Sequence, residues 1–217
     1  MRLTDARFGR DLLRYRLALE MLHFHARSRT IERWTGLSIY RIRTLRGYVS
    51  DAPELAMTPL RGVSPHQPAA LFRSAQIRTE GALLAGFLHQ FKVIPQGPHI
   101  ENAAEVIPSL VRGVRLVRAY RQFTSLLPAP SISIEYTILL LVELARGIEI
   151  TLAACKRCGV LVLVDRLAVG LPRCAQCQHV LQAGLSRAVV LRAEEVATSS
   201  ESASVAEQRE GTQGSLF

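Results

Sequence analysis

The sequence predicts a mainly α-helical protein with a small metal-binding module near its C-terminus. Apolar residues recur every three to four positions in several segments before residue 148, which is the period of an amphipathic helix. All the cysteines follow that point, in two Cys-x2-Cys pairs. From Thr198 onward Ser, Glu, Gln and Gly dominate, a composition typical of disorder. We therefore expect a multi-helix domain over residues 1–148, a four-cysteine zinc-ribbon-like module over 149–187 and a disordered C-terminal tail over 188–217.

A helix-turn-helix-like segment over residues 29–49 is expected after a first amphipathic helix over residues 10–27. Gly36 can supply the positive φ of a tight turn between two helices. Ser38 is a favourable N-cap for the second helix, because its hydroxyl can accept a hydrogen bond from a backbone N–H of the first turn. Apolar residues then line one face of that helix: Ile39, Ile42, Leu45 and Val49.

The opposite face of that second helix carries the residues that we expect to contact DNA: Tyr40, Arg41, Arg43, Thr44 and Arg46. Arginine side chains suit guanine edges and phosphates, and hydroxyl groups are adaptable partners. Residues 1–50 are strongly basic, with 11 arginines against 4 acidic residues. The alternative is an ordinary helical corner with a solvated basic face, since Glu32 and Arg33 stand where a helix-turn-helix usually has a small residue.

Three further helices are expected before the cysteine module, over residues 69–91, 101–123 and 131–146. A connection rich in proline, residues 50–68, precedes them. Because proline is best tolerated in a first helical turn, a start near Pro108 is the alternative for the second of these helices. Gly147 is the expected C-cap of the third. A row of arginines on the second helix suits either a phosphate backbone or a solvated face: Arg112, Arg115, Arg118 and Arg121.

The cysteines predict one structural zinc ion. Two Cys-x2-Cys knuckles separated by 15 residues contain all of them: Cys155, Cys158, Cys174 and Cys177. Each knuckle lets two thiolates reach one ion, and two knuckles complete a tetrahedron of sulfur around Zn2+. Four thiolates leave no open coordination position, so the expected role is folding. A strand over residues 149–152 and the apolar run 160–164 indicate a ribbon hairpin around the first knuckle.

Composition narrows the classes of function. The chain is 48% hydrophobic and 21% charged, as in a globular protein, and its apolar runs are too short to cross a bilayer. Two structural disulfides would suit an exported protein, but the N-terminus has no apolar export segment. Motifs of hydrolases and nucleotide-binding enzymes are missing from the sequence, so we expect no enzyme activity. The formal charge of +9 favours nucleic acid or an acidic partner.

The order of these parts resembles the FlhC family, the C subunit of the bacterial flagellar master transcriptional activator. Three stretches carry the resemblance: Ala26 to Gly47, Gly62-x-x-Pro65, and Gly147 through Cys177-Gln178. The first of them ends in Leu-Arg-Gly, as that family's segment does. The likeness covers about residues 12–178, and its cysteine module is the specific part.

The resemblance implies a cytoplasmic subunit of a DNA-binding transcriptional activator that controls flagellar gene expression. It implies a heteromeric complex with the partner subunit FlhD, binding to promoter DNA and recruitment of RNA polymerase, without membrane contact. The family's zinc ligands carry over onto Cys155, Cys158, Cys174 and Cys177. The alternative is a zinc-ribbon protein-interaction adaptor with a generic basic surface. An RNA-binding zinc ribbon fits less well, since only 6% of the residues are aromatic and could stack on bases.

Overall fold

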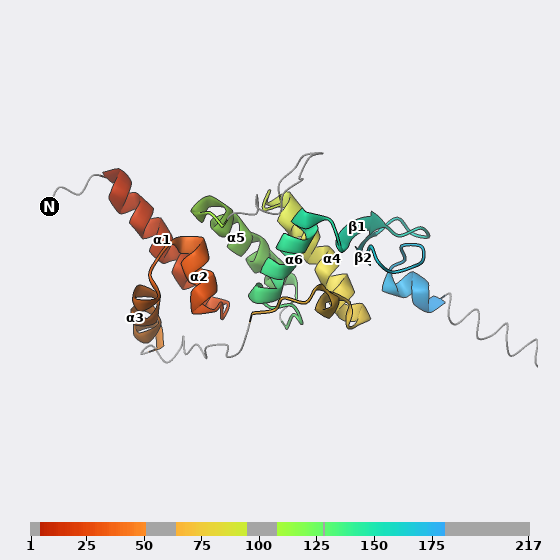
Figure 1. The fold of residues 1–217 in the computed structure, drawn as a ribbon, viewed down its shortest axis with the longest axis horizontal. Helices are drawn as coiled ribbons and strands as arrows, with labels where there is room; N and C mark the ends of the chain where they lie inside the picture. Colours follow the sequence, from red (N-terminus) through yellow and green to blue (C-terminus); the bar gives the residue numbers. More distant parts are fainter. Residues whose placement is uncertain (1–4, 51–63, 95–107, 128, 181–217) are drawn as a thin grey trace, which may run out of the picture. The chain divides into compact units, whose positions relative to one another are not determined.

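The computed structural model describes residues 5–50, 64–94, 108–127 and 129–180, and it is mainly helical (Figure 1). The helices are α1 (Asp5–His23), α2 (Ser28–Thr35), α3 (Ile39–Ser50), the 3-10 helix η2 (Pro68–Phe72), α4 (Ala75–Gln90), α5 (Leu110–Leu126) and α6 (Ile134–Arg146). Two strands follow, β1 (Ile150–Ala154) and β2 (Leu161–Asp165). The predicted fold class is therefore confirmed, and no helix within those ranges is long and apolar enough to span a membrane.

The chain divides into two compact units, Met1–Pro172 and Arg173–Phe217. Of the second unit, the structure describes only the residues up to 180. The tail predicted over 188–217 lies outside the described residues, as do positions 51–63 of the predicted connection. The domain boundary predicted at residue 148 stays a prediction.

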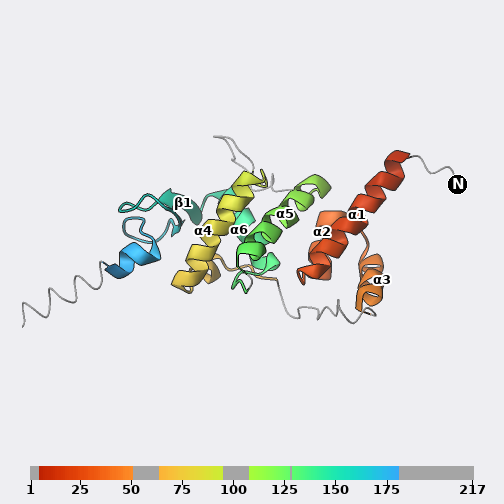
Figure 2. The ribbon, with the colours of Figure 1, turned by 180° about the vertical axis from the view of Figure 1, so that it is seen from behind.

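The core of the first unit forms around α5. This helix lies between the α1–α2 pair and α4, as both views of the ribbon show (Figures 1 and 2). Leu17 of α1, Leu84 of α4 and Leu116 of α5 are almost completely buried in one continuous apolar cluster. These residues occupy the apolar positions of their amphipathic helices, so the 3.6-residue period in the sequence becomes the packed face.

Serine caps set where three of the helices begin. Ser74 Oγ accepts a hydrogen bond from Ile77 N at 3.1 Å, and Ser109 and Ser133 cap α5 and α6 in the same way. The single helix predicted over 69–91 is therefore wrong, because the chain forms η2, leaves the helix, and restarts at the Ser74 cap. Of the two predicted starts for α5, the later one near Pro108 is observed.

The third predicted helix begins slightly later than expected and ends where expected. It starts at Ile134 rather than residue 131, because Ser133 takes the N-cap position. Gly147 has a φ of 63° and donates its N–H to Glu143 O, which confirms it as the C-cap. The left-handed conformation costs little conformational energy at this position, because glycine has no Cβ.

A buried carboxylate holds the segment before α6 in place. Glu80 of α4 accepts hydrogen bonds from Ser131 N at 2.8 Å and Ile132 N at 3.3 Å, and also from the side chains of Gln76 and Ser131. Tyr120 donates its hydroxyl to Ile132 O at 2.9 Å. Burial, with a contribution from the Glu80 charge, raises the pKa of Tyr120 to about 12, so this hydroxyl keeps its proton at neutral pH.

The packing of α1 on α5 should tolerate no side chain at Gly113. A Cβ there would lie 2.6 Å from Leu17 Cδ2 and 3.3 Å from Trp34 Cε3, and both side chains are buried. We expect Gly113→Ala to destabilise the protein by about 1–3 kcal/mol, because the overlap outweighs the gain of about 1 kcal/mol in helix propensity. Thermal unfolding would measure the loss.

Gly86 of α4 provides the matched control for that substitution. A Cβ at Gly86 meets nothing within 4 Å, so Gly86→Ala should stabilise the protein by up to about 1 kcal/mol. Equal changes in the melting temperature of the two variants would contradict close packing at Gly113.

Candidate metal centre and nucleic-acid interface

The first cysteine knuckle is the turn of a hairpin that packs on the helices. β1 and β2 pair in antiparallel register, with Leu152 opposite Leu163. β1 contacts α6 and β2 contacts α4, where Leu163 Cδ2 lies 3.2 Å from the place that a Cβ of Gly81 would occupy. Ile150 is fully buried at the start of β1. The predicted ribbon hairpin is thus observed, anchored to the helical core.

Backbone hydrogen bonds shape the first knuckle. Cys155 N–H donates to Val160 O at 2.8 Å, and Gly159 N–H donates to Cys155 O at 2.9 Å. Gly159 has a φ of 75°, which a glycine adopts at little cost. Cys155 is 3% exposed, whereas Cys158 lies at the surface. The turn therefore holds two thiols on one short connection between paired strands.

The chain then returns to the first knuckle through a loop fixed at both ends. Asp165 Oδ1 accepts a hydrogen bond from Leu167 N at 2.8 Å at the start of this loop. At its other end, Lys156 N–H donates to Pro172 O at 2.9 Å. This second bond holds Pro172, the last residue of the first unit, against the backbone of the first knuckle.

The second knuckle begins a short helical stretch. Cys177 N–H donates to Cys174 Sγ at 3.4 Å, and Gln178 N–H donates to Cys174 O at 2.9 Å. Residues 175–180 are helical. The hydrogen bond to Cys174 Sγ fixes the position of that sulfur atom within the knuckle.

The four cysteines lie together. Their Sγ atoms are all within 4.8 Å of one another, the only group of three or more His, Cys, Asp or Glu in the described ranges with such an arrangement. In a tetrahedral site with Zn–S bonds of about 2.3 Å, the sulfur atoms are about 3.8 Å apart. The cluster of Cys155, Cys158, Cys174 and Cys177 could therefore hold a metal ion.

The helix pair α2–α3 has a turn fixed by short-range contacts. Gly36 has a φ of 70° and donates its N–H to Glu32 O at 2.8 Å. Thr35 Oγ1 donates to Ile31 O and accepts from Leu37 N at 3.1 Å. Leu37 is 2% exposed, so the turn is also an apolar anchor between the two helices.

The two faces of α3 differ as the sequence predicts. Ile42 and Val49 are buried, and Leu45 packs partly against the core. The outward side chains are all exposed: Tyr40, Arg41, Arg43 and Thr44. Glu32 and Arg33 of α2 do not occupy its buried face, which consists of Thr30, Ile31, Trp34 and Thr35. Glu32 and Arg33, which stand where a helix-turn-helix usually has a small residue, therefore do not disturb the packing of α2 on α3.

Two residues of α3 differ from the predicted DNA-contact set. Arg46 is partly buried and donates from Nη2 to Ala26 O at 3.3 Å, and burial lowers the pKa of its guanidinium. It links α3 to the α1–α2 connection rather than extending outward. Tyr48 is 74% exposed and lies one turn beyond Thr44 on the outward face. The i, i+4, i+8 spacing from Tyr40 could have identified it.

The arginine row on α5 does not form one continuous basic stripe. Arg115 donates to Lys92 O at 3.3 Å, and Arg121 forms an ion pair with Glu20 of α1. Arg118 remains exposed between them. Two arginines of the row thus make contacts within the protein, and both alternatives for the row, a phosphate backbone or a solvated face, stay predictions.

Comparison with known proteins does not assign the chain to a family. No family model matches the chain, and no curated protein matches it significantly. The helical fold and the cysteine cluster rest on the structure itself, and the resemblance to the FlhC family stays a prediction.

Proposed function

We propose that this chain is the DNA-binding subunit of a transcriptional activator of the FlhC type, with α3 as the helix that enters the major groove. The observation that carries the proposal is the outward face of α3, where Tyr40, Arg41, Arg43 and Thr44 are exposed together. A helix held by one apolar face and lined on the other with arginine and hydroxyl groups suits base edges and phosphates.

The charge of the chain supports the same proposal. Arginines concentrate in residues 1–50, which include all of α3, and the chain as a whole has a formal charge of +9. Such an excess attracts DNA over distances of about a Debye length and supplies much of the non-specific affinity. Within this proposal, Arg46 positions α3 through its bond to Ala26 O, and Tyr48 joins the contact surface.

The metal of the cysteine cluster is proposed to be one Zn2+ ion with a structural role. Soft thiolate ligands in a closed set of four favour zinc over harder divalent ions. When bound, the ion would join the hairpin turn at Cys155 and Cys158 to the helical stretch that follows Cys174. The proposal assigns no catalytic activity to the chain.

The partners are proposed from the resemblance. An FlhD-type subunit in a hetero-oligomer, promoters of flagellar genes, RNA polymerase and a cytoplasmic location follow from it. Exposed apolar side chains on α1, such as Phe8 and Leu12, are consistent with a chain that functions in a complex.

Replacing Arg43 by alanine should weaken specific DNA binding. We expect a loss of about 1–3 kcal/mol on a flagellar promoter duplex and a smaller loss on a scrambled duplex, because a base-reading contact discriminates between sequences. Fluorescence anisotropy on the chain co-purified with its candidate partner subunit would measure both. Arg73→Ala, at an exposed arginine outside the α2–α3 pair, is the control that removes the same charge.

The opposite result would favour the adaptor alternative. If both duplexes bind equally at micromolar concentration, and Arg43→Ala and Arg73→Ala behave alike, the basic charge is generic. The α3 face would then be assigned to an acidic protein surface instead of DNA.

A further inference from the structure

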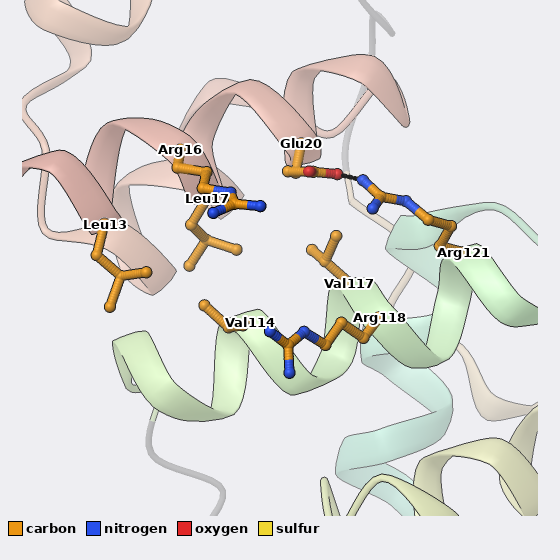
Figure 3. Close-up of a pocket in the computed structure, with 8 residues that line it drawn as sticks. All are labelled: Leu13, Arg16, Leu17, Glu20, Val114, Val117, Arg118 and Arg121. Atoms are coloured by element: carbon orange, nitrogen blue, oxygen red, sulfur yellow. Dashed lines mark ion pairs between the residues drawn. The ribbon is translucent and has the colours of Figure 1, made fainter.

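A groove runs between α1 and α5, and no residue of α3 lines it (Figure 3). Its apolar lining comes from both helices: Leu13, Leu17, Val114 and Val117. Each helix contributes lining residues at i, i+3, i+4 and i+7, so the groove follows two turns, a length of about 10 Å. Leu17 and Val117 are buried at its base, while Leu13 is 37% exposed.

Charged groups surround this apolar base. At one end Glu20 and Arg121 form an ion pair across the two helices (Figure 3). Arg16 of α1 and Arg118 of α5 extend toward the opening from opposite sides, and both are exposed (Figure 3). Among the described residues, neither of these two arginines has an ion-pair partner. The groove therefore has an excess of positive charge, three arginines to one glutamate.

Apolar side chains extend the surface beyond the groove. On α1, Phe8 is 56% exposed and Leu12 is 59% exposed, and on α5 Val111 is 60% exposed. Such a concentration of exposed apolar residues on adjacent helices is typical of a protein interface. A phosphate backbone would gain nothing from these side chains, so charge alone does not explain the surface.

We propose that the α1–α5 groove binds an amphipathic helix from an acidic protein partner. Apolar residues of that helix, spaced one turn apart, would contact Leu13 and Val114, the partly exposed apolar residues of the groove. Asp or Glu residues beside them would pair with Arg16 and Arg118, and this charge complementarity selects an acidic segment over a neutral one. The inference goes beyond the proposed DNA-binding function, because it concerns another surface and can be tested without DNA.

The test uses the full chain and a labelled synthetic peptide. The peptide is an alanine-based helix with leucines at i, i+4 and i+7 and glutamates at the flanking positions, and a second peptide has glutamine in place of glutamate. Anisotropy should show the acidic peptide binding at least about tenfold more tightly than the neutral one. Arg118→Glu should abolish that preference, whereas Arg118→Lys should retain it because the charge is kept.

Arg73→Glu is the matched control, since it makes the same charge reversal at an exposed arginine outside the groove. Unchanged peptide binding in this variant is expected. No binding of the acidic peptide, equal binding of both peptides, or equal effects of Arg118→Glu and Arg73→Glu would overturn the proposal. Promoter binding of Arg118→Glu, measured in parallel, separates this outcome from any failure of the α3 proposal.

Discussion

Removing the metal ligands should unfold the four-cysteine segment and leave the helical core folded. In zinc-binding peptides the free energy of binding is about 10–16 kcal/mol at neutral pH, so a short segment depends on the ion for its structure. The hydrogen bonds described for the second knuckle include local ones, from the backbone N–H groups of Cys177 and Gln178 to Cys174. The hairpin retains its own anchors, because Ile150 and Leu163 are buried against the helices.

If the cysteine cluster binds one metal ion per chain, as we propose, Cys155→Ser should lose that ion. Hydrogen exchange should rise strongly in residues 155–160 and 166–180, while strands β1 and β2 and helices α4 and α5 keep their protection, because Ile150 and Leu163 anchor the strands in the helical core. Metal analysis of the purified chain and hydrogen-exchange mass spectrometry would measure the two effects. Ala154→Ser introduces the same hydroxyl one position earlier, at an exposed residue. This control should change neither the metal content nor the hydrogen exchange. A Cys155→Ser variant that keeps its metal and its protection would contradict a four-thiolate site.

The parts of the structure that depend on local chemistry could be predicted from the sequence. Gly36 between α2 and α3, Gly147 after α6 and the two cysteine knuckles are all set by residues within a few positions of one another. Ser74 was an equally local indication of a helix start, but the apolar pattern on both sides of it concealed the break. Periodicity identifies helices more reliably than it identifies their ends.

The parts that depend on tertiary contacts could not be predicted. The bond from Arg46 to Ala26 O joins residues that no spacing rule connects, and it holds an arginine that the pattern assigned to DNA against the α1–α2 connection. The ion pair of Arg121 with Glu20 and the groove beside it require α1 and α5 to be adjacent. The sequence showed the basic row on α5 but not which of its arginines were already paired.

The start of α2 depends on another contact of this kind, made by the buried carboxylate of Glu135 in the first turn of α6. One oxygen accepts from Arg27 N at 2.9 Å, and the other accepts from Thr30 Oγ1 at 3.0 Å and Ser64 Oγ at 3.2 Å. Arg27 is the N-cap residue of α2 and forms no side-chain cap of its own. Glu135 of α6 therefore accepts a hydrogen bond at the N-terminus of α2, the role that the side chain of an N-cap residue normally has.

Replacing Glu135 should destabilise the protein in a graded way. Glu135→Ala removes the acceptor of three donors and the ion-pair partner of Arg27, whose Nη1 lies 3.9 Å from Oε2, at a residue that is 5% exposed, so we expect a loss of about 3–5 kcal/mol. Glu135→Gln should lose only about 1–2 kcal/mol, because its carbonyl can still accept from Arg27 N while the hydroxyls turn to accept from its amide. Thermal unfolding of the metal-loaded chain would show the order, with the alanine variant about 10 °C lower.

The same variants connect the core of the first unit to the proposed DNA surface. Because Glu135 fixes the N-terminus of α2, and α2 orients α3 through the turn at Gly36, Glu135→Ala should raise hydrogen exchange in α2 and α3 more than in α4. Glu32→Ala is the control on α2 itself, since the side chain of Glu32 makes no hydrogen bond or ion pair among the described residues, and its effect should stay within about 0.5 kcal/mol. If the glutamine and alanine variants are equally unstable, negative charge at this position contributes more than hydrogen bonding. If neither variant differs from Glu32→Ala, Glu135 does not hold α2 to α6.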